Sequence, residues 1–393
     1  MQRTHDLTIF GATGFVGRLI AAHLATDPGE LRIALAGRSR DRLEALRREL
    51  AVDWPLVVAD TAQPTTLAAM ARDTTAVLST VGPYTDSGMA LVGACAEAGA
   101  HYCDLTGEAI FVADSIAAFD ELARDTGAAI VHSCGFDSVP SDLSVHLARG
   151  LAGADGAGHP VGSVLTVTKL AGGFSGGTLA SMRGQFAAAA ADPERARLVG
   201  NEYALCPGTP PRRGEVLLES SNHGYTGPFV MGPYNRQLVH RSDQLASDGT
   251  VRLQHRERLA TGRGPQGLVR AAGMIAALGA ATVGFSTRAL APALDRVLPA
   301  PGDGPSPEQR ERGRFRMETE LTTSTGARYR SVAADDRDPG YDSTAVMIGE
   351  AGRLLATGRA ERAGVLTPAT ALGDALVDRL RANGSTLTCE RVG

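Results

Sequence analysis

Short apolar runs alternate with helical patterns along the first third of the chain. The runs have the length of buried strands, and most are followed by a glycine or an acidic residue. They span residues 7–10, 32–36, 56–59, 76–81, 101–105 and 128–132. Helical patterns at residues 89–98 and about 113–125 lie between them. Strands that alternate with helices in this way predict an α/β domain built on a doubly wound parallel sheet.

The remainder of the chain has a mixed pattern. Residues 153–162 are rich in Gly, Ala and Pro, as is typical of a connector, and residues 206–263 show no clear order of elements. Strands are predicted at 164–170, 215–218 and 251–255. A β-hairpin is predicted at 314–323 and 327–333, with its turn at 325–326. Helices are predicted to begin at 175, to run from 344 to 355 and to run from 368 to about 382.

The first strand ends in a glycine-rich turn that opens a helix. The turn reads Gly11-Ala12-Thr13-Gly14-Phe15-Val16-Gly17. The first glycine makes a tight turn, the next lets the backbone approach a phosphate, and the helix N-terminus supplies oriented N–H donors. We therefore expect a dinucleotide to bind at Gly11, Ala12, Thr13, Gly14, Phe15 and Val16.

The end of the second strand indicates which dinucleotide binds. In NAD enzymes an acidic residue usually stands there and holds the ribose hydroxyls. This chain has Gly37 followed by Arg38 and Ser39, a guanidinium and a hydroxyl suited to a 2′-phosphate. The chain is therefore predicted to bind NADP(H), and the nearby Asp41 is predicted to cap the following helix.

Two further strand ends are candidates for contact with the dinucleotide. Asp60 ends the third strand, near the adenine position of a Rossmann domain, although an ordinary helix N-cap explains it as well. Val81, Gly82 and Pro83 follow the fourth strand. Because ligands bind at the carboxyl ends of such strands where the strand order reverses, we expect these three residues beside the nicotinamide-ribose.

Candidates for a proton donor lie at the same strand ends. They are Tyr84, Asp104, Glu108 and Asp137. Each also has a structural explanation, because the aspartates can tie down loops and Tyr84 can pack over the cofactor. The Tyr-x-x-x-Lys pair of short-chain reductases is excluded, since the one lysine is Lys169 and position 165 is a leucine.

Composition and charge narrow the class of protein. The 393 residues are 43% hydrophobic and carry a formal net charge of −4, which suits a large core and argues against a nucleic-acid-binding surface. The five cysteines form no C-x-x-C pair, so neither a metal site nor a disulfide framework is indicated. Cys134 is a weak candidate nucleophile, since cysteine is commonly a small buried residue. No signal peptide is apparent, and we expect a cytoplasmic protein.

One uncharged stretch has to be considered as a membrane-spanning or membrane-contacting helix. Ala271 to Thr287 lack charge and reach the lower edge of the length that a bilayer span needs. They are dominated by Ala and Gly, with larger apolar residues at helical spacing. We expect a helix that packs on the protein or makes peripheral membrane contact through residues 268–287, rather than a span.

Several separated motifs together resemble a known family. They are the glycine turn, Ala36-Gly37-Arg38, Gly82-Pro83-Tyr84, the run from His101 to Glu108, and Cys134-Gly135-Phe136-Asp137-Ser138-Val139-Pro140-Ser141-Asp142. In this order they are similar to the saccharopine dehydrogenase-like superfamily and, within it, to its trans-acting enoyl reductase branch. Later segments at 302–306, 313–315 and 364–369 fit the same branch, so the resemblance covers nearly the whole chain.

The resemblance implies both a fold and a function. It implies a Rossmann domain over residues 1–150, a second α+β domain on a mixed sheet over residues 151–365, and a last helix, 366–384, that packs back onto the first domain. It also implies NADPH-dependent reduction of a carbon–carbon double bond on lipid-like or polyketide-like acyl chains. Tyr84 is then the preferred proton donor, because a phenol can protonate an enolate. Candidates to line an acyl-chain groove are Phe174, Leu179, Met182 and Phe186.

Two other functions stay open. One is a dehydrogenase of the same fold that reduces a polar imino or keto acid, although residues 135–142 depart from the Gly-Asp-Pro-Gly turn of the saccharopine-forming enzymes. The other is a nucleotide-binding, lipid-associated scaffold without turnover, since a fold does not determine a function. A homodimer is the expected oligomeric state.

Overall fold

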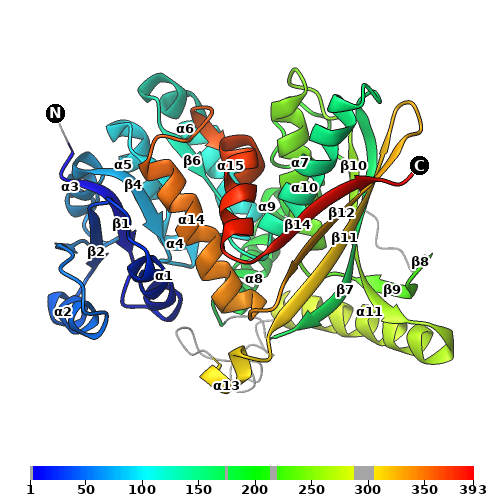
Figure 1. Ribbon diagram of the computed structural model, residues 1–393, viewed down its shortest axis with the longest axis horizontal. Helices are drawn as coiled ribbons and strands as arrows, with labels where there is room; N and C mark the ends of the chain where they lie inside the picture. Colours follow the sequence, from blue (N-terminus) through cyan, green and yellow to red (C-terminus); the bar gives the residue numbers. More distant parts are fainter. Residues whose placement is uncertain (1–2, 173–175, 213–218, 287–304) are drawn as a thin grey trace. The chain divides into compact units, whose positions relative to one another are not determined.

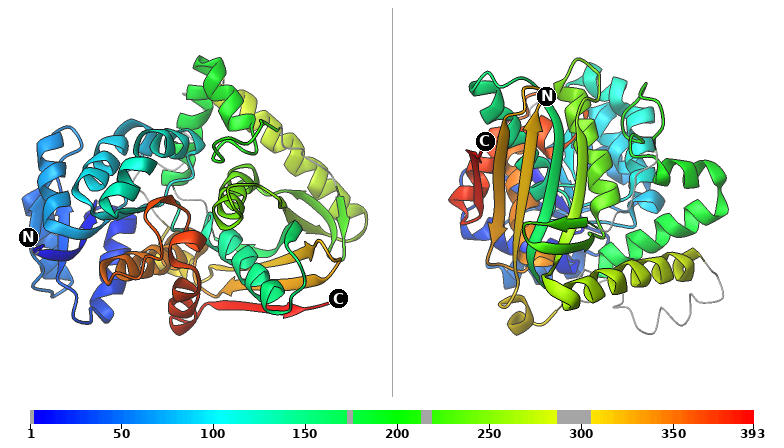
Figure 2. Two further views of the ribbon diagram at one scale, coloured as in Figure 1. Left: turned by 90° about the horizontal axis from the view of Figure 1, so that it is seen from above. Right: turned by 90° about the vertical axis from the view of Figure 1, so that its right-hand side faces the viewer.

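The structure is a computed structural model that describes residues 3–172, 176–212, 219–286 and 305–393 (Figures 1 and 2). Within these residues the chain forms two compact units. The first contains the residues up to Val139 and returns from Gly340 to Asn383. The second contains most of the residues from Pro140 to Pro339 and the final Gly384–Gly393.

A parallel sheet of seven strands forms the centre of the first unit (Figure 1). Its strands are β1 (His5–Phe10), β2 (Ile33–Gly37), β3 (Leu56–Val58), β4 (Thr74–Ser79), β5 (His101–Cys103), β6 (Ala129–Val131) and β13 (Gly364–Leu366). Their order is β13-β6-β5-β4-β1-β2-β3, and every pairing is parallel. This is the strand order of a dinucleotide-binding Rossmann sheet with one strand added, so the predicted doubly wound fold is confirmed.

Helices cover both faces of this sheet. They are α1 (Phe15–Thr26), α2 (Arg40–Glu49), α3 (Pro64–Asp73), α4 (Tyr84–Ser87), α5 (Met89–Ala98), α6 (Ala109–Thr126), α14 (Thr344–Ala356) and α15 (Pro368–Ala382). α14 contacts α1 and α15 in one layer, and α5 contacts α3 and α6 in the other (Figure 2). Strand residues such as Leu7, Ile9 and Leu78 are fully buried between the layers, as expected for a parallel sheet covered on both sides.

The first unit differs in extent from the domain expected over residues 1–150. Position 150 falls inside α7 (Val139–Ala154), which belongs to the second unit from Pro140 onward. In addition, α14 and β13 belong to the first unit rather than to a domain over 151–365. α14 lies directly against the sheet, where a Cβ on Gly352 would be 3.0 Å from Leu78 Cδ1. α15, in the segment expected to pack back, is also part of the first unit.

The second unit is built on another sheet of seven strands. These are β7 (Pro160–Ala171), β8 (Glu219–Ser221), β9 (Gly224–Pro228), β10 (Gln254–Gly262), β11 (Arg314–Thr323), β12 (Arg328–Asp335) and β14 (Thr386–Arg391), in the order β14-β12-β11-β7-β10-β9-β8. β7 and β10 pair in parallel, and the other neighbours are antiparallel. The expected mixed sheet and the predicted hairpin of β11 and β12 are therefore confirmed.

The second unit also contains helices, some of which pack on its sheet. These helices are α7, α8 (Gly176–Ala191), α9 (Pro193–Gly200), α10 (Gly232–Ala246), α11 (Gly264–Ser286) and α13 (Pro307–Arg310). A short π-helical turn, Pro339–Ser343, follows where the chain passes from the second unit to the first. α7 and α10 pack on the sheet, where Val145 and Val239 share a core with Leu321 and Tyr329. The predicted strand at 251–255 is largely wrong, because β10 begins at Gln254, and the strand predicted at 215–218 lies outside the described residues.

Candidate active site

The glycine turn after β1 leads into an open helix N-terminus. Gly11 has a φ of +87°, in the left-handed region that favours glycine. A side chain on Gly17 would place its Cβ 2.2 Å from the carbonyl oxygen of Gly11, so α1 can begin this close to the turn only with glycine there. Gly14 is the N-cap of α1, with no side-chain cap, and the first helical turn contains no acidic residue. Its N–H groups are thus arranged to bind an anion.

This turn meets the end of β4, the neighbour of β1 in the sheet. A Cβ on Gly11 would lie 2.6 Å from Thr80 Oγ1 and 2.8 Å from Val81 Cγ2. The Thr80 hydroxyl donates to the Gly11 carbonyl at 3.2 Å. Between β1 and β4 the strand order reverses, which is the ligand position in folds of this kind. The structure therefore brings the predicted pyrophosphate residues together with the segment from Val81 to Pro83.

Arg38 and Ser39 follow β2 at the same edge of the sheet. Ser39 is the N-cap of α2, and its Oγ accepts a hydrogen bond from the N–H of Arg42 at 3.4 Å. The prediction that Asp41 caps this helix is therefore wrong, because Asp41 already lies within the first helical turn. Arg38, Arg40 and Arg42 are all exposed, so three arginines stand at this helix N-terminus where only Arg38 was expected.

Asp60 is engaged in its own turn after β3. Its Oδ1 accepts from the N–H of Ala62 at 3.0 Å, and its own N–H donates to the Thr66 hydroxyl at 3.1 Å. The N-cap of α3 is Gln63 rather than Asp60. These contacts give Asp60 a local structural role, and its contact with an adenine stays a prediction.

Tyr84 is held by two backbone groups. It is 5% exposed, and its hydroxyl donates to the carbonyl of Ser79 and accepts from the N–H of Leu105, both at 3.2 Å. Burial, with the charges of Asp104 and Glu108, raises the pKa of the phenol well above its usual range. A phenol held in this way ties β4 to the loop after β5, and these contacts do not favour it as a proton donor.

Glu108 caps the short helix α4 from the loop after β5. Its Oε1 accepts from the N–H of Tyr84 at 2.9 Å, and its Oε2 accepts from the N–H of Thr85 at 2.8 Å and from the Thr85 hydroxyl at 2.5 Å. The residue is 1% exposed. Both carboxylate oxygens therefore serve to position the segment that follows Pro83.

Asp104 is fully buried at the centre of another network. Its Oδ1 accepts from the N–H groups of Thr106 at 3.1 Å and Ser133 at 3.0 Å. Its Oδ2 lies 2.7 Å from His132 Nδ1, and His132 Nε2 lies 2.9 Å from Ser115 Oγ in α6. This network joins the ends of β5 and β6 to α6. It favours the loop-tying explanation of Asp104 over direct contact with a substrate.

The turn after β6 is held against the returning C-terminal segment. Ser133 at its start has a φ of +67°, an uncommon conformation for a residue with a side chain. The N–H of Phe136 donates to the Thr344 hydroxyl at 3.1 Å. A Cβ on Gly135 would lie 2.8 Å from Leu105 Cδ2. The path of this turn is thus set by contacts on both sides.

Asp137 lies on this turn and differs from the other candidates in exposure. Tyr84, Asp104 and Glu108 are buried, whereas Asp137 is partly exposed. Cys134 on the same turn is fully buried, and its thiol donates to the Val131 carbonyl at 3.6 Å. Among the predicted acidic candidates, Asp137 has the clearest access to a ligand.

Two residues of the returning segment lie at this edge without having been predicted there. One is Thr344, the partner of Phe136. The other is Tyr341, whose ring packs edge-on against Phe15 with the centroids 5.0 Å apart. The sequence indicated only a helix beginning near Thr344, because contacts between segments this far apart leave no local pattern.

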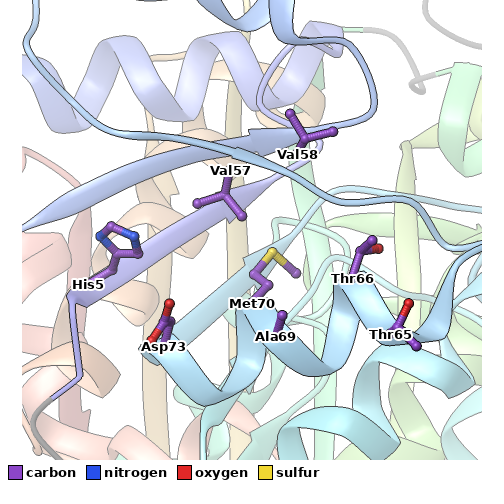
Figure 3. Close-up of a pocket in the computed structure, with 8 residues that line it drawn as sticks. All are labelled: His5, Val57, Val58, Thr65, Thr66, Ala69, Met70 and Asp73. Atoms are coloured by element: carbon purple, nitrogen blue, oxygen red, sulfur yellow. The ribbon is translucent and has the colours of Figure 1, made fainter.

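A cavity of about 260 Å³ lies between β3 and α3 in the first unit (Figure 3). Val57 and Met70 contribute apolar lining, and His5 and Asp73 lie toward one end. His5 opens β1, whereas Gly11 follows the other end of that strand. This cavity is therefore not the predicted pyrophosphate position.

The predicted apolar segment and groove residues fall in the second unit. α11 covers nearly all of the segment 268–287. Among the described residues, no helix combines the length and the apolar character needed to cross a membrane. Phe174 and the side chains of Leu179, Met182 and Phe186 lie outside the described part of the chain.

Comparison with known proteins defines the class. Residues 7–131 match the family model described as the saccharopine dehydrogenase NADP binding domain. The solved structure of apo saccharopine dehydrogenase (L-Glu forming) from Saccharomyces cerevisiae aligns with a TM-score of 0.57 at 11% identity and covers 99% of this chain and 100% of that chain. The first unit is thus a nicotinamide-dinucleotide-binding domain, within the fold of a saccharopine dehydrogenase.

Relatives along the full length define the family. The trans-acting enoyl reductase of Mycobacterium ulcerans is 43% identical over 415 residues, which cover 100% of this chain and 99% of the relative. The protein of the same name from Mycobacterium tuberculosis strain H37Rv is 41% identical with the same coverage. The chain belongs to the trans-acting enoyl reductase family, as its motifs predict.

Proposed function

We propose that this chain is an NADPH-dependent enoyl reductase that acts on lipid-like or polyketide-like acyl thioesters. The observation that carries the proposal is the open helix N-terminus of α1, which follows the Gly11 turn and abuts the end of β4 in a chain of this family. An uncapped helix start at the strand-order reversal suits the pyrophosphate of a nicotinamide cofactor.

The preference for NADPH over NADH follows from the end of β2. Gly37 stands where an acid would repel a 2′-phosphate, and Arg38, Arg40 and Arg42 gather at the N-terminus of α2. Asp41 is the one acid within this first turn, and it is outnumbered by the three guanidinium groups. These residues would hold the 2′-phosphate, while the N–H groups of Phe15 and Val16 would face the pyrophosphate.

The reaction requires a hydride at the β-carbon and a proton at the α-carbon of the enoyl thioester. When bound, NADPH supplies the hydride. The chain must deliver the proton and hold the reacting carbons in place. Asp104 and Glu108 are buried in hydrogen-bonded networks, and the Tyr84 hydroxyl donates a hydrogen bond to the Ser79 carbonyl. Of the four candidates Asp137 is the one that is partly exposed, and on this ground we assign proton delivery to it, directly or through one water.

The two alternative functions, a reductase of a polar imino or keto acid and a scaffold without turnover, have weaker support. The yeast saccharopine dehydrogenase shares the fold at 11% identity, and that likeness carries no substrate to this chain. A scaffold without turnover would bind NADPH through the same glycine turn. The full-length relatives cited above are named enoyl reductases, so they support neither alternative.

The test is NADPH oxidation by the purified full chain with a series of medium- and long-chain enoyl thioesters. Matched reactions contain a saturated thioester or a glutamate-derived imine. We expect oxidation with the enoyl thioesters and none above background with the others. Oxidation with the imine alone would establish the polar-substrate alternative, and tight NADPH binding without oxidation of any substrate would favour the scaffold.

A further inference from the structure

The solvent-facing side of α11 is apolar. A helix on the surface of a soluble unit normally places charged residues opposite the core, and a helix that is apolar all round is normally covered. On α11 the exposed positions include Val269, Ala272, Gly273 and Ala276. Val269 is 70% exposed and the adjoining Leu268 39%. Apart from Arg270, the exposed positions from 268 to 277 are uncharged, which is unusual for a face in contact with water.

The other side of α11 is anchored, so this orientation is set by packing. Ala271 is fully buried, and a Cβ on Gly227 of β9 would lie 3.3 Å from Met274 Sδ. The hydroxyl of Thr261 donates to the Gly267 carbonyl at 2.8 Å. The helix lies against β9 and β10 (Figure 2), and Val269 and Ala276 are among its exposed positions.

The charged residues of α11 and of the adjoining α8 have a single sign. α11 contains Arg270 and no Asp or Glu over its 23 residues, and exposed Arg263 immediately precedes it. α8, which contacts α11, contains Arg183 and also no acidic residue. Exposed apolar side chains with basic residues at their border are the combination that binds the interface of an anionic bilayer.

We propose that the outer face of α11, defined by Leu268, Val269, Ala272, Gly273 and Ala276 with Arg270 at its border, docks the protein on an anionic lipid surface. The helix lies in the plane of the interface and does not cross it. Val269 and Leu268 enter the headgroup region, and Arg270 faces lipid phosphates. The inference rests on the surface of the second unit alone and does not depend on the enoyl reductase activity.

The test is co-sedimentation of the full chain with vesicles of phosphatidylglycerol and phosphatidylcholine, compared with phosphatidylcholine alone. We expect binding to the anionic vesicles that weakens as salt is raised. Leu268→Glu/Val269→Glu should reduce binding by roughly tenfold or more, and Arg270→Glu by a smaller factor. The matched control is Val58→Glu, because Val58 is an exposed apolar residue of β3 at 45% exposure and lies in the first unit.

Three outcomes would overturn the proposal. They are no binding of wild-type protein to anionic vesicles, equal loss of binding in Val58→Glu and the α11 variant, and a wild-type dimer that the α11 variant dissociates without any vesicle binding. The last result would assign the face to a second copy of the chain. NADPH binding and thermal unfolding of each variant verify that it is folded.

Discussion

The glycine turn and the carboxylates of Asp104 and Glu108 stand at the ends of strands of one sheet, yet their polar groups are used in opposite ways. At the turn, backbone N–H groups lie at an uncapped helix start. Around Asp104 and Glu108, backbone N–H groups, hydroxyls and a histidine already pair with the carboxylate oxygens. The first region is arranged to receive an anion, and the second is arranged to hold loops.

This difference shows that residue type and position in a Rossmann sheet do not by themselves identify a catalytic group. Asp104, Glu108 and Asp137 are all acidic residues at strand ends, and nothing in the sequence favours one of them over the others. Burial separates them, because a buried carboxylate held in a hydrogen-bonded network is costly to disturb and has no open path to a substrate. Asp137 differs in its partial exposure.

The largest effect is expected at the glycine turn. Gly17→Ala would place a methyl group 2.2 Å from the Gly11 carbonyl, so α1 must shift. We expect NADPH affinity to fall by about a hundredfold or more, equivalent to about 2.8 kcal/mol. Titration of NADPH by fluorescence measures it. The control is Gly150→Ala in α7, which has no neighbour within 4 Å and should stabilise the helix by roughly 0.5–1 kcal/mol.

Two substitutions, Asp104→Asn and Asp137→Asn, compare a carboxylate that holds loops with the one proposed to deliver the proton. Asp104→Asn puts an amide into a network of N–H donors and should lower the free energy of unfolding by about 2–3 kcal/mol. Asp137→Asn, at a partly exposed position, should cost less stability than Asp104→Asn and should lower turnover at least about tenfold. Denaturant unfolding and steady-state kinetics with an enoyl thioester measure both.

A third substitution, Tyr84→Phe, tests whether Asp137 or Tyr84 delivers the proton. Tyr84→Phe removes two buried hydrogen bonds and should cost about 1–2 kcal/mol of stability while leaving kcat nearly unchanged. A loss of kcat in Tyr84→Phe together with full activity in Asp137→Asn would return the proton to the phenol.

A smaller effect is expected at the 2′-phosphate. Arg38→Ala should weaken NADPH binding about tenfold, or about 1.4 kcal/mol, and leave NADH binding unchanged. Arg48→Ala, at the other end of α2, is the matched control. Equal dissociation constants for NADPH in wild type and Arg38→Ala would show that this guanidinium does not contact the phosphate.

The smallest effect concerns Glu350, a paired carboxylate in α14. Glu350 is 1% exposed and accepts from His23 at 2.9 Å and Arg379 at 2.6 Å. Burial alone would raise its pKa, but the hydrogen bonds from His23 and Arg379 and the charges of Arg353 and Arg379 together hold the pKa below its usual range. A folded pKa below the unfolded value of about 4.3 stabilises the protein above that pH, and the stabilisation is lost as the pH falls through the folded value.

Glu350→Gln should therefore cost about 1 kcal/mol at pH 7, and the difference from wild type should shrink below about pH 4. Urea unfolding at both pH values measures it. A difference that is constant over this range would mean that the charge of Glu350 contributes nothing to folding.

The sequence predicted the first unit better than the second, and the reason lies in where polar residues are buried. β1, β2 and β4 are apolar runs covered on both faces, so their composition alone reveals them. β10 buries His255 and Glu257 while Arg256 between them is exposed, so it shows no apolar alternation. α10 likewise buries Asn235 and His240.

Some residues of the candidate site could be predicted from the sequence and others could not. The glycine turn, Arg38 and the segment from Val81 to Pro83 follow strand ends in the order expected of a Rossmann sheet, so sequence placed them correctly at one edge. Ser39 as the cap of α2 could have been predicted, because serine is a favoured N-cap residue. Tyr341 beside Phe15 depends on a contact between distant segments, which leaves no local pattern.

The most direct test of an NADPH-dependent enoyl reductase follows the hydride itself. The full chain is incubated with an enoyl thioester and NADPH deuterated at the transferable position of C4, and the product is analysed by mass spectrometry and NMR. We predict a saturated thioester with one deuterium at the β-carbon. Deuterium on a carbonyl-derived carbon, or unlabelled substrate recovered from protein that demonstrably binds NADPH, would contradict the proposed reaction.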